Sequence, residues 1–427
     1  MRLPFYLLPD HAAVDAASGR LALAGVDVLS LAEEYGTPLF VYDEGHLRSR
    51  CREAVAAWGD GVAYGSKAFL CLAMARLAHE EGMWIDVATG GELHVVLSAG
   101  VPAERVVLHG NNKSGEELAR AVEAGVGRIV VDSFDEIDRL ESLAPSASGR
   151  PRVLVRVTPG IEAHTHEYVM TGQADSKFGF GMASGQAAEA VARLARSSAV
   201  ELVGIHAHIG SQIFLADSFR REVEVLAGFF RPLGLPELCV GGGLGVPYVA
   251  GEEAPTLSQW AQTVKSACQQ YGIPPETRVT AEPGRSIAAA AGMTLYRVGT
   301  VKEIPGVRTY VSVDGGMSDN PRPVLYGSGY EAFLARCPED ERERLVTIVG
   351  KHCESGDFIV RNTHVPAGLA VDDVLVTPVT GAYGHSMASN YNKVPRPAVV
   401  FVAEGRARLV VRRETPDDLL RLDVSDQ

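Results

Sequence analysis

Residues 62–67 read VAYGSK, a short apolar run that stops at a lysine. Seven further runs of this kind follow before residue 290, each rich in Val, Ile, Leu or Ala and each ending in a small, polar or charged cluster. Amphipathic stretches of helical period separate the runs, as in residues 115–124 and 187–196. The eight runs end at Lys67, Asp86, His109, Asp132, Arg156, His208, the glycines at 241–243 and Glu282.

This alternation of strand and helix patterns predicts a parallel sheet, and eight such units closed on themselves form a TIM-like (β/α)8 barrel. In such barrels the loops after the strands build the active site, because the strand ends converge on one mouth. We therefore expect the polar residues at the ends of the runs to face one another.

The pattern changes near residue 290. The later runs are short, β-branched and interrupted by Gly, Pro and Asp, which is typical of a second, all-β domain. They lie at residues 293–301, 309–313, 345–349, 357–361, 374–379, 398–403 and 407–412. The expected organisation is an N-terminal segment (residues 1–40) that joins the β domain, a barrel (residues 41–288) and a C-terminal β domain (residues 289–427).

Bulk composition favours a soluble enzyme. The 427 residues exceed what one hydrophobic core usually supports, so two domains are expected. The net charge of −13 opposes nonspecific nucleic-acid binding. No apolar run approaches the roughly 20 residues that span a bilayer, and the N-terminus MRLPFYLLPD has no small-residue cleavage site. We expect a cytoplasmic protein that binds neither membrane nor nucleic acid.

The sequence offers no convincing metal site. The six cysteines show no CxxC or other metal-binding spacing, and they are too sparse for a disulfide scaffold. His164 and His166 resemble a metal-binding pair, but no third ligand stands at a fixed distance from them. We interpret them, together with residues 177–180, as part of a mobile loop that closes the barrel mouth.

Lys67 and Glu282 are the first candidates for chemistry. A lysine at the end of a barrel strand lies in a partly desolvated setting, where its neutral amine can form a Schiff base. Taken alone, a lysine at a strand end more often only extends to water, and the other candidates below are what favour chemistry. Glu282 precedes a Pro-Gly turn and could pair with the protonated ring nitrogen of pyridoxal phosphate, although glutamates before turns are common.

The loops after the sixth and seventh runs add candidates for binding a phosphate. GGGLG at residues 241–245 has backbone without side chains, which lets amides approach a phosphate. Phosphate sites in these barrels often lie after strands seven and eight. His208 and Ser211 in HAHIGSQ could stack on a cofactor ring and bind its phosphate, although a single histidine in a barrel is more often a core residue.

A set of motifs, in this order, resembles the diaminopimelate decarboxylase family: YGSKAF, HGNNKS, KFGFG, HIGSQ, GGGLG, EPGR, DGGMSDNPRP, CESGD and GAYGHSMASNYN. That family belongs to the alanine-racemase-like, fold type III class of pyridoxal phosphate enzymes. The resemblance extends from about residue 38 to residue 397. It implies a barrel plus a β domain and the decarboxylation of meso-2,6-diaminopimelate to L-lysine and carbon dioxide, the last step of lysine biosynthesis.

The resemblance also assigns the contacts of the cofactor, pyridoxal 5'-phosphate. Lys67 would hold it covalently, His208 would stack on its ring, and the Glu282 carboxylate would meet the pyridine nitrogen. Asp86 and Arg156 would help to orient the cofactor, although buried charges at strand ends often only pair with each other. The phosphate would be surrounded by Ser211, Gly243, the Tyr383 phenol and the backbone of Glu282, Pro283, Gly284 and Arg285. Gly242 would also contact the cofactor.

Two arginines suggest how a substrate is bound. Arg285 in EPGR and Arg322 in DNPRP stand next to prolines in turns, and guanidinium groups bind carboxylates bidentately. Two fixed arginines suit a substrate with a carboxylate remote from the reacting centre. The resemblance adds Tyr326, Tyr383 and Glu354, with Glu354 countering the distal ammonium of diaminopimelate.

Cys353 stands beside Glu354 in KHCESGD. A neighbouring acid disfavours the thiolate, and a protonated thiol is what a general acid needs. The resemblance implies that Cys353 reaches across a dimer interface and returns a proton after carbon dioxide leaves. We therefore expect a homodimer with shared active sites.

Two other readings remain open. One is a related decarboxylase that acts on ornithine, arginine, carboxynorspermidine or a substrate of secondary metabolism. The other is a pyridoxal phosphate-binding protein without catalysis, which the CESGD and GAYG motifs of the β domain argue against. A racemase is weaker still, since no convincing second base replaces Cys353.

Overall fold

The computed structural model describes residues 4–143, 149–161 and 175–424. The chain divides into two compact units. The first, here called the barrel unit, comprises Arg50–Val246 and Glu253–Ser286. The second, here called the β unit, comprises Met1–Ser49, Pro247–Glu252 and Ile287–Gln427.

Eight parallel strands form the barrel, in the hydrogen-bonded order β13-β12-β11-β9-β8-β7-β6-β5. The two ends of this series also meet, because the amides of Ala63 and Gly65 donate to the carbonyls of Ala281 and Pro283. The predicted barrel is therefore confirmed. Its strands are β5 (Ala63–Gly65), β6 (Trp84–Val87), β7 (Val106–Leu108), β8 (Arg128–Val131), β9 (Arg152–Thr158), β11 (Glu201–His206), β12 (Glu237–Cys239) and β13 (Arg278–Thr280), and β10 (Phe180–Gly181) pairs with β9.

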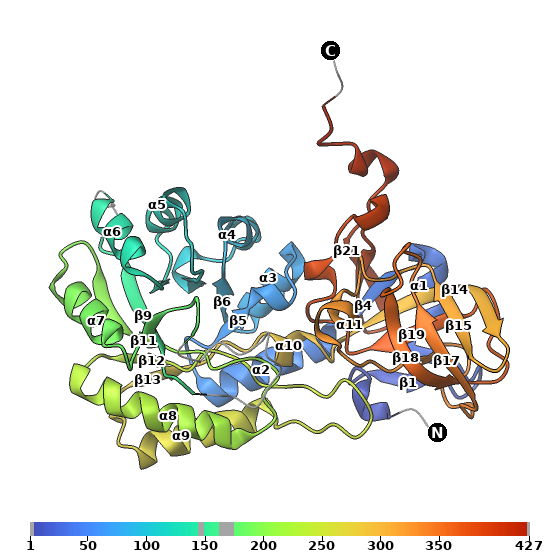
Figure 1. The fold of residues 1–427 in the computed structure, drawn as a ribbon, viewed down its shortest axis with the longest axis horizontal. Coiled ribbons are helices and arrows are strands. Elements are labelled where there is room, and N and C mark those ends of the chain that lie inside the picture. Colours follow the sequence, from blue (N-terminus) through green and yellow to red (C-terminus); the bar gives the residue numbers. More distant parts are fainter. Residues whose placement is uncertain (1–3, 144–148, 162–174, 425–427) are drawn as a thin grey trace. The chain divides into compact units, whose positions relative to one another are not determined.

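Helices follow the strands and lie on the outside of the barrel (Figure 1). They are α3 (Leu72–Glu80), α4 (Gly90–Ser98), α5 (Gly115–Ala124), α6 (Phe134–Ser142), α7 (Gln186–Arg196), α8 (Ala216–Phe230) and α9 (Leu257–Gln270). Two further helices, α2 (Glu44–Trp58) and the single turn α10 (Arg285–Ala288), contain residues of both units. One buried cluster fills the interior of the barrel, with one residue from each barrel strand from β5 to β12. Its members are Ala63, Trp84, Val107, Val130, Leu154, Val203 and Cys239.

Capping residues fix where the helices begin after the strands. Ser114 and Glu117 at the start of α5 each accept a hydrogen bond from the other's backbone amide, a reciprocal capping box. The same Ser/Thr-x-x-Glu spacing begins two further helices, at Thr89 and Glu92 for α4 and at Ser133 and Glu136 for α6. This spacing places a carboxylate in the first turn of each of these helices.

The β unit is built around one long strand, β14 (Gly292–Ile304), which pairs with β4 (Leu39–Asp43), β15 (Arg308–Val313) and β19 (Val374–Pro378). Its sheet also contains β16 (Phe333–Leu334), β17 (Arg344–Val349), β18 (Phe358–Val365), β20 (Ala398–Ala403) and β21 (Arg406–Val411). A separate small sheet contains β1 (Ala12–Val14), β2 (Leu21–Leu23) and β3 (Val26–Asp27). Every predicted run after residue 290 is a strand to within a few residues.

Two helices also belong to the β unit, α1 (Val28–Tyr35) and α11 (Arg322–Tyr326). Asp27 caps α1 by accepting a hydrogen bond from the Leu29 amide. Buried side chains of β4, including Leu39 and Val41, join those of β14, β19 and β20 in one apolar core. In the ranges that the structure describes, no helix is both long enough and apolar enough to span a bilayer.

Candidate active site

Lys67 lies just beyond β5, in the single 3-10 turn Ser66–Ala68 (η2), so the strand ends two residues earlier than predicted. Gly65 is held against the loop after β13, since its amide donates to the Pro283 carbonyl at 3.1 Å. The Lys67 side chain is exposed, and none of the described residues forms a hydrogen bond or ion pair with its ammonium. An amine that is not bound to other side chains is suited to react with a carbonyl.

Glu282 lies two residues after β13, and its side chain is held by two histidines. The Nε2 atom of His109 is 2.8 Å from one carboxylate oxygen, and the Nε2 atom of His206 is 3.0 Å from the other. Burial alone would raise the pKa of Glu282, but the two rings outweigh burial and hold the pKa well below its ordinary value. Glu282 is therefore an ionised carboxylate.

Asp86 lies within β6 and approaches the same group, with Oδ1 3.7 Å from His109 Nε2. Burial raises the pKa of Asp86 to about 6, although the charges of His109 and Lys67 oppose this effect. Asp86 and Glu282 in turn raise the pKa of His109 against the effect of its burial, which favours a cationic ring. The mouth of the barrel thus holds a compact set of opposite charges.

His208 lies two residues beyond the end of β11, and its ring has a fixed orientation. The Gly242 amide donates to His208 Nδ1 at 3.1 Å, so this nitrogen carries no proton. Burial lowers the pKa of His208 well below its ordinary value, and the charges of Lys67 and Arg156 lower it further. A neutral, oriented imidazole is suited to stack on a flat ring.

The glycine-rich turn after β12 requires its glycines. Gly241 and Gly243 have φ angles of 64° and 111°, in the region that side chains rarely adopt. A Cβ atom on Gly242 would collide with the carbonyl oxygen of Glu282. The loops after β12 and β13 can therefore approach each other closely only because residue 242 has no side chain.

Ser211 and Arg285 are paired within the barrel unit. Arg285 Nη2 donates to Ser211 Oγ at 2.9 Å, and the arginine is buried. A guanidinium and a hydroxyl in loops next to the glycine turn form a donor set suited to an anion such as a phosphate.

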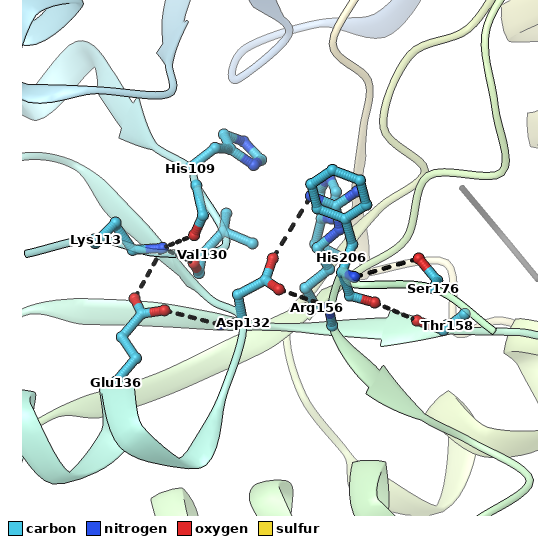
Figure 2. Close-up of polar contacts among 12 residues, drawn as sticks. His109, Lys113, Val130, Asp132, Glu136, Arg156, Thr158, Ser176 and His206 are labelled. Carbon is cyan, nitrogen blue, oxygen red and sulfur yellow. Dashed lines mark hydrogen bonds and ion pairs between the residues drawn. The ribbon is translucent and has the colours of Figure 1, made fainter. Parts of the chain in front are cut away.

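A second group of charges lies in the segments that follow β7 and β8 (Figure 2). The Lys113 ammonium is buried, 2.8 Å from a Glu136 oxygen, and it also donates to the carbonyls of Gly110 and Val130 at 2.6 and 2.8 Å. The other Glu136 oxygen accepts from the Asp132 amide at 3.0 Å. The carboxylate that follows the α6 cap is thus used to fix the end of β8.

Asp132 continues this network to Arg156 (Figure 2). One carboxylate oxygen accepts from the Gly179 amide at 2.6 Å, and the other is 3.6 Å from Arg156 Nη1. The guanidinium also lies 4.5 Å from the centre of the Phe178 ring. Arg156 lies within β9 rather than at its end, and its direct charge partner is Asp132.

In the β unit, three of the motifs meet. The Ser389 amide donates to the Ser318 carbonyl at 2.8 Å, and the Ser318 hydroxyl is 2.8 Å from His352 Nε2. The other ring nitrogen of His352 lies 3.1 Å from the side-chain oxygen of Asn392. These contacts join the DGGMSDNPRP, KHCESGD and GAYGHSMASNYN segments.

Cys353 and Glu354 lie exposed on one of these loops. Asp357 fixes the backbone there, because its carboxylate accepts from the amides of Met317 and His352 at 2.7 and 2.9 Å. The Tyr391 hydroxyl donates to Glu354, and this hydrogen bond raises the pKa of Tyr391. The thiol thus stands on an exposed but well-supported loop.

Arg322 begins the short helix α11 and is buried between aromatic rings. Its guanidinium lies 4.3 Å from the centre of the Tyr248 ring, and Nη1 donates to the Tyr330 hydroxyl at 2.7 Å. Burial opposes the charge, but the hydroxyls of Tyr248 and Tyr330 raise the pKa of Arg322 above its ordinary value. Tyr326 is half-buried at the other end of α11.

Tyr383 sits in a strained loop of the β unit. Its φ angle is 61°, and that of Val379 is 58°, both in the left-handed region that bulky and β-branched residues avoid. A Cβ atom on Gly381 would collide with the Ala288 carbonyl. Strain of this kind, worth on the order of 1–3 kcal/mol for each residue, is concentrated at functional sites in proteins.

The chain is similar to known proteins over most of its length. Residues 44–289 match the family described as pyridoxal-dependent decarboxylase, pyridoxal binding domain. The chain is 48% identical to diaminopimelate decarboxylase of Mycobacterium tuberculosis and 46% identical to that of Bacillus subtilis, each over 95% of both chains. A crystal structure of the M. jannaschii diaminopimelate decarboxylase with L-lysine matches 98% of both chains, with 32% identity and a TM-score of 0.89.

The chain belongs to the diaminopimelate decarboxylase family. The family resemblance predicted from the sequence motifs is therefore confirmed, and so is pyridoxal phosphate as the cofactor. Members of this family are carboxy-lyases.

The residues of the barrel mouth fit this cofactor. An amine without a hydrogen-bond partner among the described residues can react with its aldehyde, and the ionised Glu282 can face its ring nitrogen. The imidazole of His208 is neutral and oriented, and Ser211 and Arg285 offer donors to its phosphate. No single residue decides the fit, but an aldehyde, a basic ring nitrogen and a phosphate each find a suitable group.

Several residues of this site were not assigned a role from the sequence. His109 appeared only as the end of an apolar run, and His206, Lys113 and Glu136 were not singled out. The available signals were the two histidines of HAHIGSQ, two residues apart at the end of an apolar run, and the Ser-x-x-Glu cap of α6. Tyr248, Tyr330 and Tyr391 were missed as well, since their partners are remote in sequence or lie on other loops.

The described residues contain one group with metal-ligand chemistry, His109, His206 and Glu282, whose ligand atoms lie within 4.8 Å of one another. Hydrogen bonds from the two rings to the two carboxylate oxygens account for this grouping. His164 and His166, with the loop closure expected of them, lie outside the described residues.

Proposed function

We propose that this chain catalyses the pyridoxal phosphate-dependent decarboxylation of meso-2,6-diaminopimelate to L-lysine and carbon dioxide, the last step of lysine biosynthesis. The observation that carries this proposal is the 48% identity to the M. tuberculosis diaminopimelate decarboxylase over 95% of both chains. The M. jannaschii diaminopimelate decarboxylase was solved with L-lysine, a molecule identical to the proposed product. The cytoplasmic location stays a prediction from the sequence.

In the barrel unit, each group has a role toward the cofactor. When bound, pyridoxal phosphate supplies an electron sink that makes loss of the α-carboxylate possible. Lys67 would hold it covalently, Glu282 would pair with the ring nitrogen and His208 would stack on the ring. Asp86 and Arg156 would orient it through the charges described above. Its phosphate would be bound by Ser211, Gly243, the Tyr383 phenol and the backbone of Glu282, Pro283, Gly284 and Arg285, and Gly242 would also contact the cofactor.

Arg322 is the strongest candidate to bind the distal carboxylate of the substrate. Its two aromatic neighbours fix the guanidinium and leave its charge unneutralised by any carboxylate among the described residues. A fixed, unneutralised guanidinium binds a carboxylate with little loss of conformational entropy. Tyr326, Tyr383 and Arg285 would complete this end of the site, and Glu354 would face the distal ammonium.

Cys353 would hold the proton that returns to the carbon from which carbon dioxide departs. The carbon-carboxylate bond breaks, carbon dioxide leaves, and a carbon-hydrogen bond forms with the proton of Sγ. We also propose that the enzyme is a homodimer in which Cys353 serves the Lys67 of the partner subunit. The exposure of Cys353 on a supported loop is compatible with such a role.

A substrate panel tests the proposed activity. Purified protein supplied with pyridoxal phosphate would be given meso-diaminopimelate, ornithine, arginine or carboxynorspermidine, and carbon dioxide release would be measured. We expect rapid release from meso-diaminopimelate with equimolar L-lysine. Release mainly from another substrate would show a related decarboxylase, and no release from any would show a cofactor-binding protein without catalysis.

Mixing two inactive variants tests the shared site. If Lys67→Ala and Cys353→Ala subunits exchange freely, half of the dimers are mixed and each mixed dimer has one intact site, so about a quarter of the wild-type activity returns. No recovery after exchange, shown by mass spectrometry of the mixed dimers, would contradict sharing. A fully active monomer in sedimentation would contradict the dimer itself.

A further inference from the structure

The contacts of Glu282 are more specific than a buried carboxylate needs. Its two oxygens are 2.8 and 3.0 Å from the Nε2 atoms of His109 and His206, which come from the ends of two different strands, β7 and β11. The side chain of Glu282 is 8% exposed, that of His109 9% and that of His206 2%. The backbone is fixed too, because the Glu282 amide donates to the Gly241 carbonyl at 2.7 Å.

Because each oxygen has its own donor, the carboxylate cannot rotate about its last side-chain bond without breaking one of the two hydrogen bonds. Each oxygen still has a second lone pair, so a third donor can be accepted. A carboxylate otherwise has a broad distribution about this bond, and fixing it on cofactor binding would cost entropy. The hydrogen bonds to the two rings already fix this rotation in the folded protein, so cofactor binding does not have to fix it.

The two histidines are not equivalent. His109 also faces Asp86 at 3.7 Å, and the two carboxylates favour its cationic form. Burial lowers the pKa of His206 to about 4, against the opposing effect of Glu282, so His206 donates as a neutral ring. The rings contact each other edge to face, with centroids 4.9 Å apart. Glu282 therefore has one cationic and one neutral hydrogen-bond donor. Both favour its ionised form, but only His109 adds a positive charge beside it.

We propose that His109 and His206 are positioning residues that hold the Glu282 carboxylate ionised and in the rotation that presents it to the ring nitrogen of the cofactor. This inference rests on the proposed cofactor contacts of Glu282. A merely structural role would also stabilise the barrel mouth, but it would not discriminate between cofactors that differ only at the ring nitrogen.

The test uses cofactor affinity, measured by absorbance and fluorescence titration of the apoprotein, with two ligands. One is pyridoxal phosphate, and the other is its 1-deaza analogue, in which a C–H group replaces the ring nitrogen. In the wild type we expect pyridoxal phosphate to bind more tightly than the analogue by about tenfold to a hundredfold, since the analogue cannot pair with Glu282. Equal affinities in the wild type would overturn the inference without any variant.

Variants then locate the effect. His206→Leu and His109→Leu should remove most of the preference for pyridoxal phosphate and leave affinity for the analogue unchanged. His206→Gln is the matched control, because its amide keeps a neutral N–H donor near the Nε2 position, and it should retain the preference. In a Glu282→Gln background, removing either histidine should cause no further loss.

Two results would contradict the proposal. One is an equal loss of affinity for both ligands in the leucine variants, which indicates a structural role. The other is an undiminished effect of the histidine changes in the Glu282→Gln background. The titrations need no substrate, so a protein that fails to decarboxylate diaminopimelate but shows this preference would refute only the proposed reaction.

Discussion

The two units hold their functional residues in different ways. At the barrel mouth, charged side chains at the strand ends and in the segments after them are buried and bind one another, as in the pairs of His109 with Glu282 and Lys113 with Glu136. In the β unit, Cys353 and Glu354 are exposed, and it is the backbone of their loop that is fixed. These residues of the barrel mouth are therefore fixed by contacts between their own side chains, whereas the CESGD loop of the β unit is fixed through its backbone by Asp357.

The largest effect that this comparison predicts is on stability. Lys113→Met leaves Glu136 buried without its cation and should lower the free energy of unfolding by about 3–5 kcal/mol. The double variant Lys113→Met with Glu136→Gln should regain much of this, because the glutamine oxygen can still accept from the Asp132 amide. Thermal and urea unfolding of the apoprotein measure both. A loss below about 1 kcal/mol for the single variant is typical of an exposed ion pair. It would contradict the view that buried charge pairs stabilise the barrel mouth.

Cys353→Ala tests the opposite behaviour in the β unit. Loss of a positioned proton donor should lower kcat by about a hundredfold or more. The melting temperature and the absorbance of the bound cofactor should stay unchanged, because the thiol is exposed and Asp357 holds its loop. Loss of cofactor or a large drop in melting temperature would instead give Cys353 a structural function.

Glu222 differs from the paired charges of the barrel mouth, although it belongs to the same unit. It is buried in α8, and within the described ranges neither carboxylate oxygen has a hydrogen-bond partner. Burial raises the pKa of Glu222 well above its ordinary value. The folded state then binds a proton that the unfolded state releases above about pH 4.5, so stability falls as pH rises toward the folded pKa. Glu222→Gln should remove a loss of roughly 1.4 kcal/mol for each pH unit in that window.

The measurement is the melting temperature of both proteins between pH 5 and pH 8. The gain of Glu222→Gln over the wild type should grow with pH. A constant difference across the range would mean that Glu222 is not protonated in the folded protein.

The smallest expected effect concerns the surroundings of Arg322. Tyr330→Phe removes the 2.7 Å hydrogen bond to the guanidinium and should raise the KM for diaminopimelate by about threefold to tenfold with kcat little changed. Tyr248→Phe is the comparison variant, since it removes a hydroxyl that raises the pKa of Arg322 but keeps the ring that stacks on the guanidinium. If Tyr248→Phe raised the KM more than Tyr330→Phe, the Tyr248 hydroxyl would matter more for substrate binding than the hydrogen bond that fixes the guanidinium.

Much of the fold could be predicted because it depends on local patterns. Apolar runs of β-branched residues located the barrel strands and the later strands. The predicted ends were wrong by two residues in four barrel strands, those expected to end at Lys67, Arg156, His208 and Glu282. The helix α11 was missed, since a five-residue helix that contains a proline has no hydrophobic period to detect. The motifs identified the family because several short segments occurred in one order.

The pairing of side chains could not be predicted in the same way. His109 and Glu282 are 173 positions apart, and His206 and Glu282 are 76 apart, so their contacts depend on closure of the barrel. Arg156 could be read either as a cofactor ligand or as half of an ion pair. The structure pairs it with Asp132, and its role toward the cofactor stays a proposal.

The central claim, that the amine just beyond β5 carries the cofactor, can be tested most directly by trapping. The holoenzyme would be reduced with borohydride, digested and mapped by mass spectrometry. We expect the pyridoxyl phosphate label on Lys67 and its absence from a Lys67→Ala control. A label on another lysine, or reduced holoenzyme with Lys67 unmodified, would contradict the account.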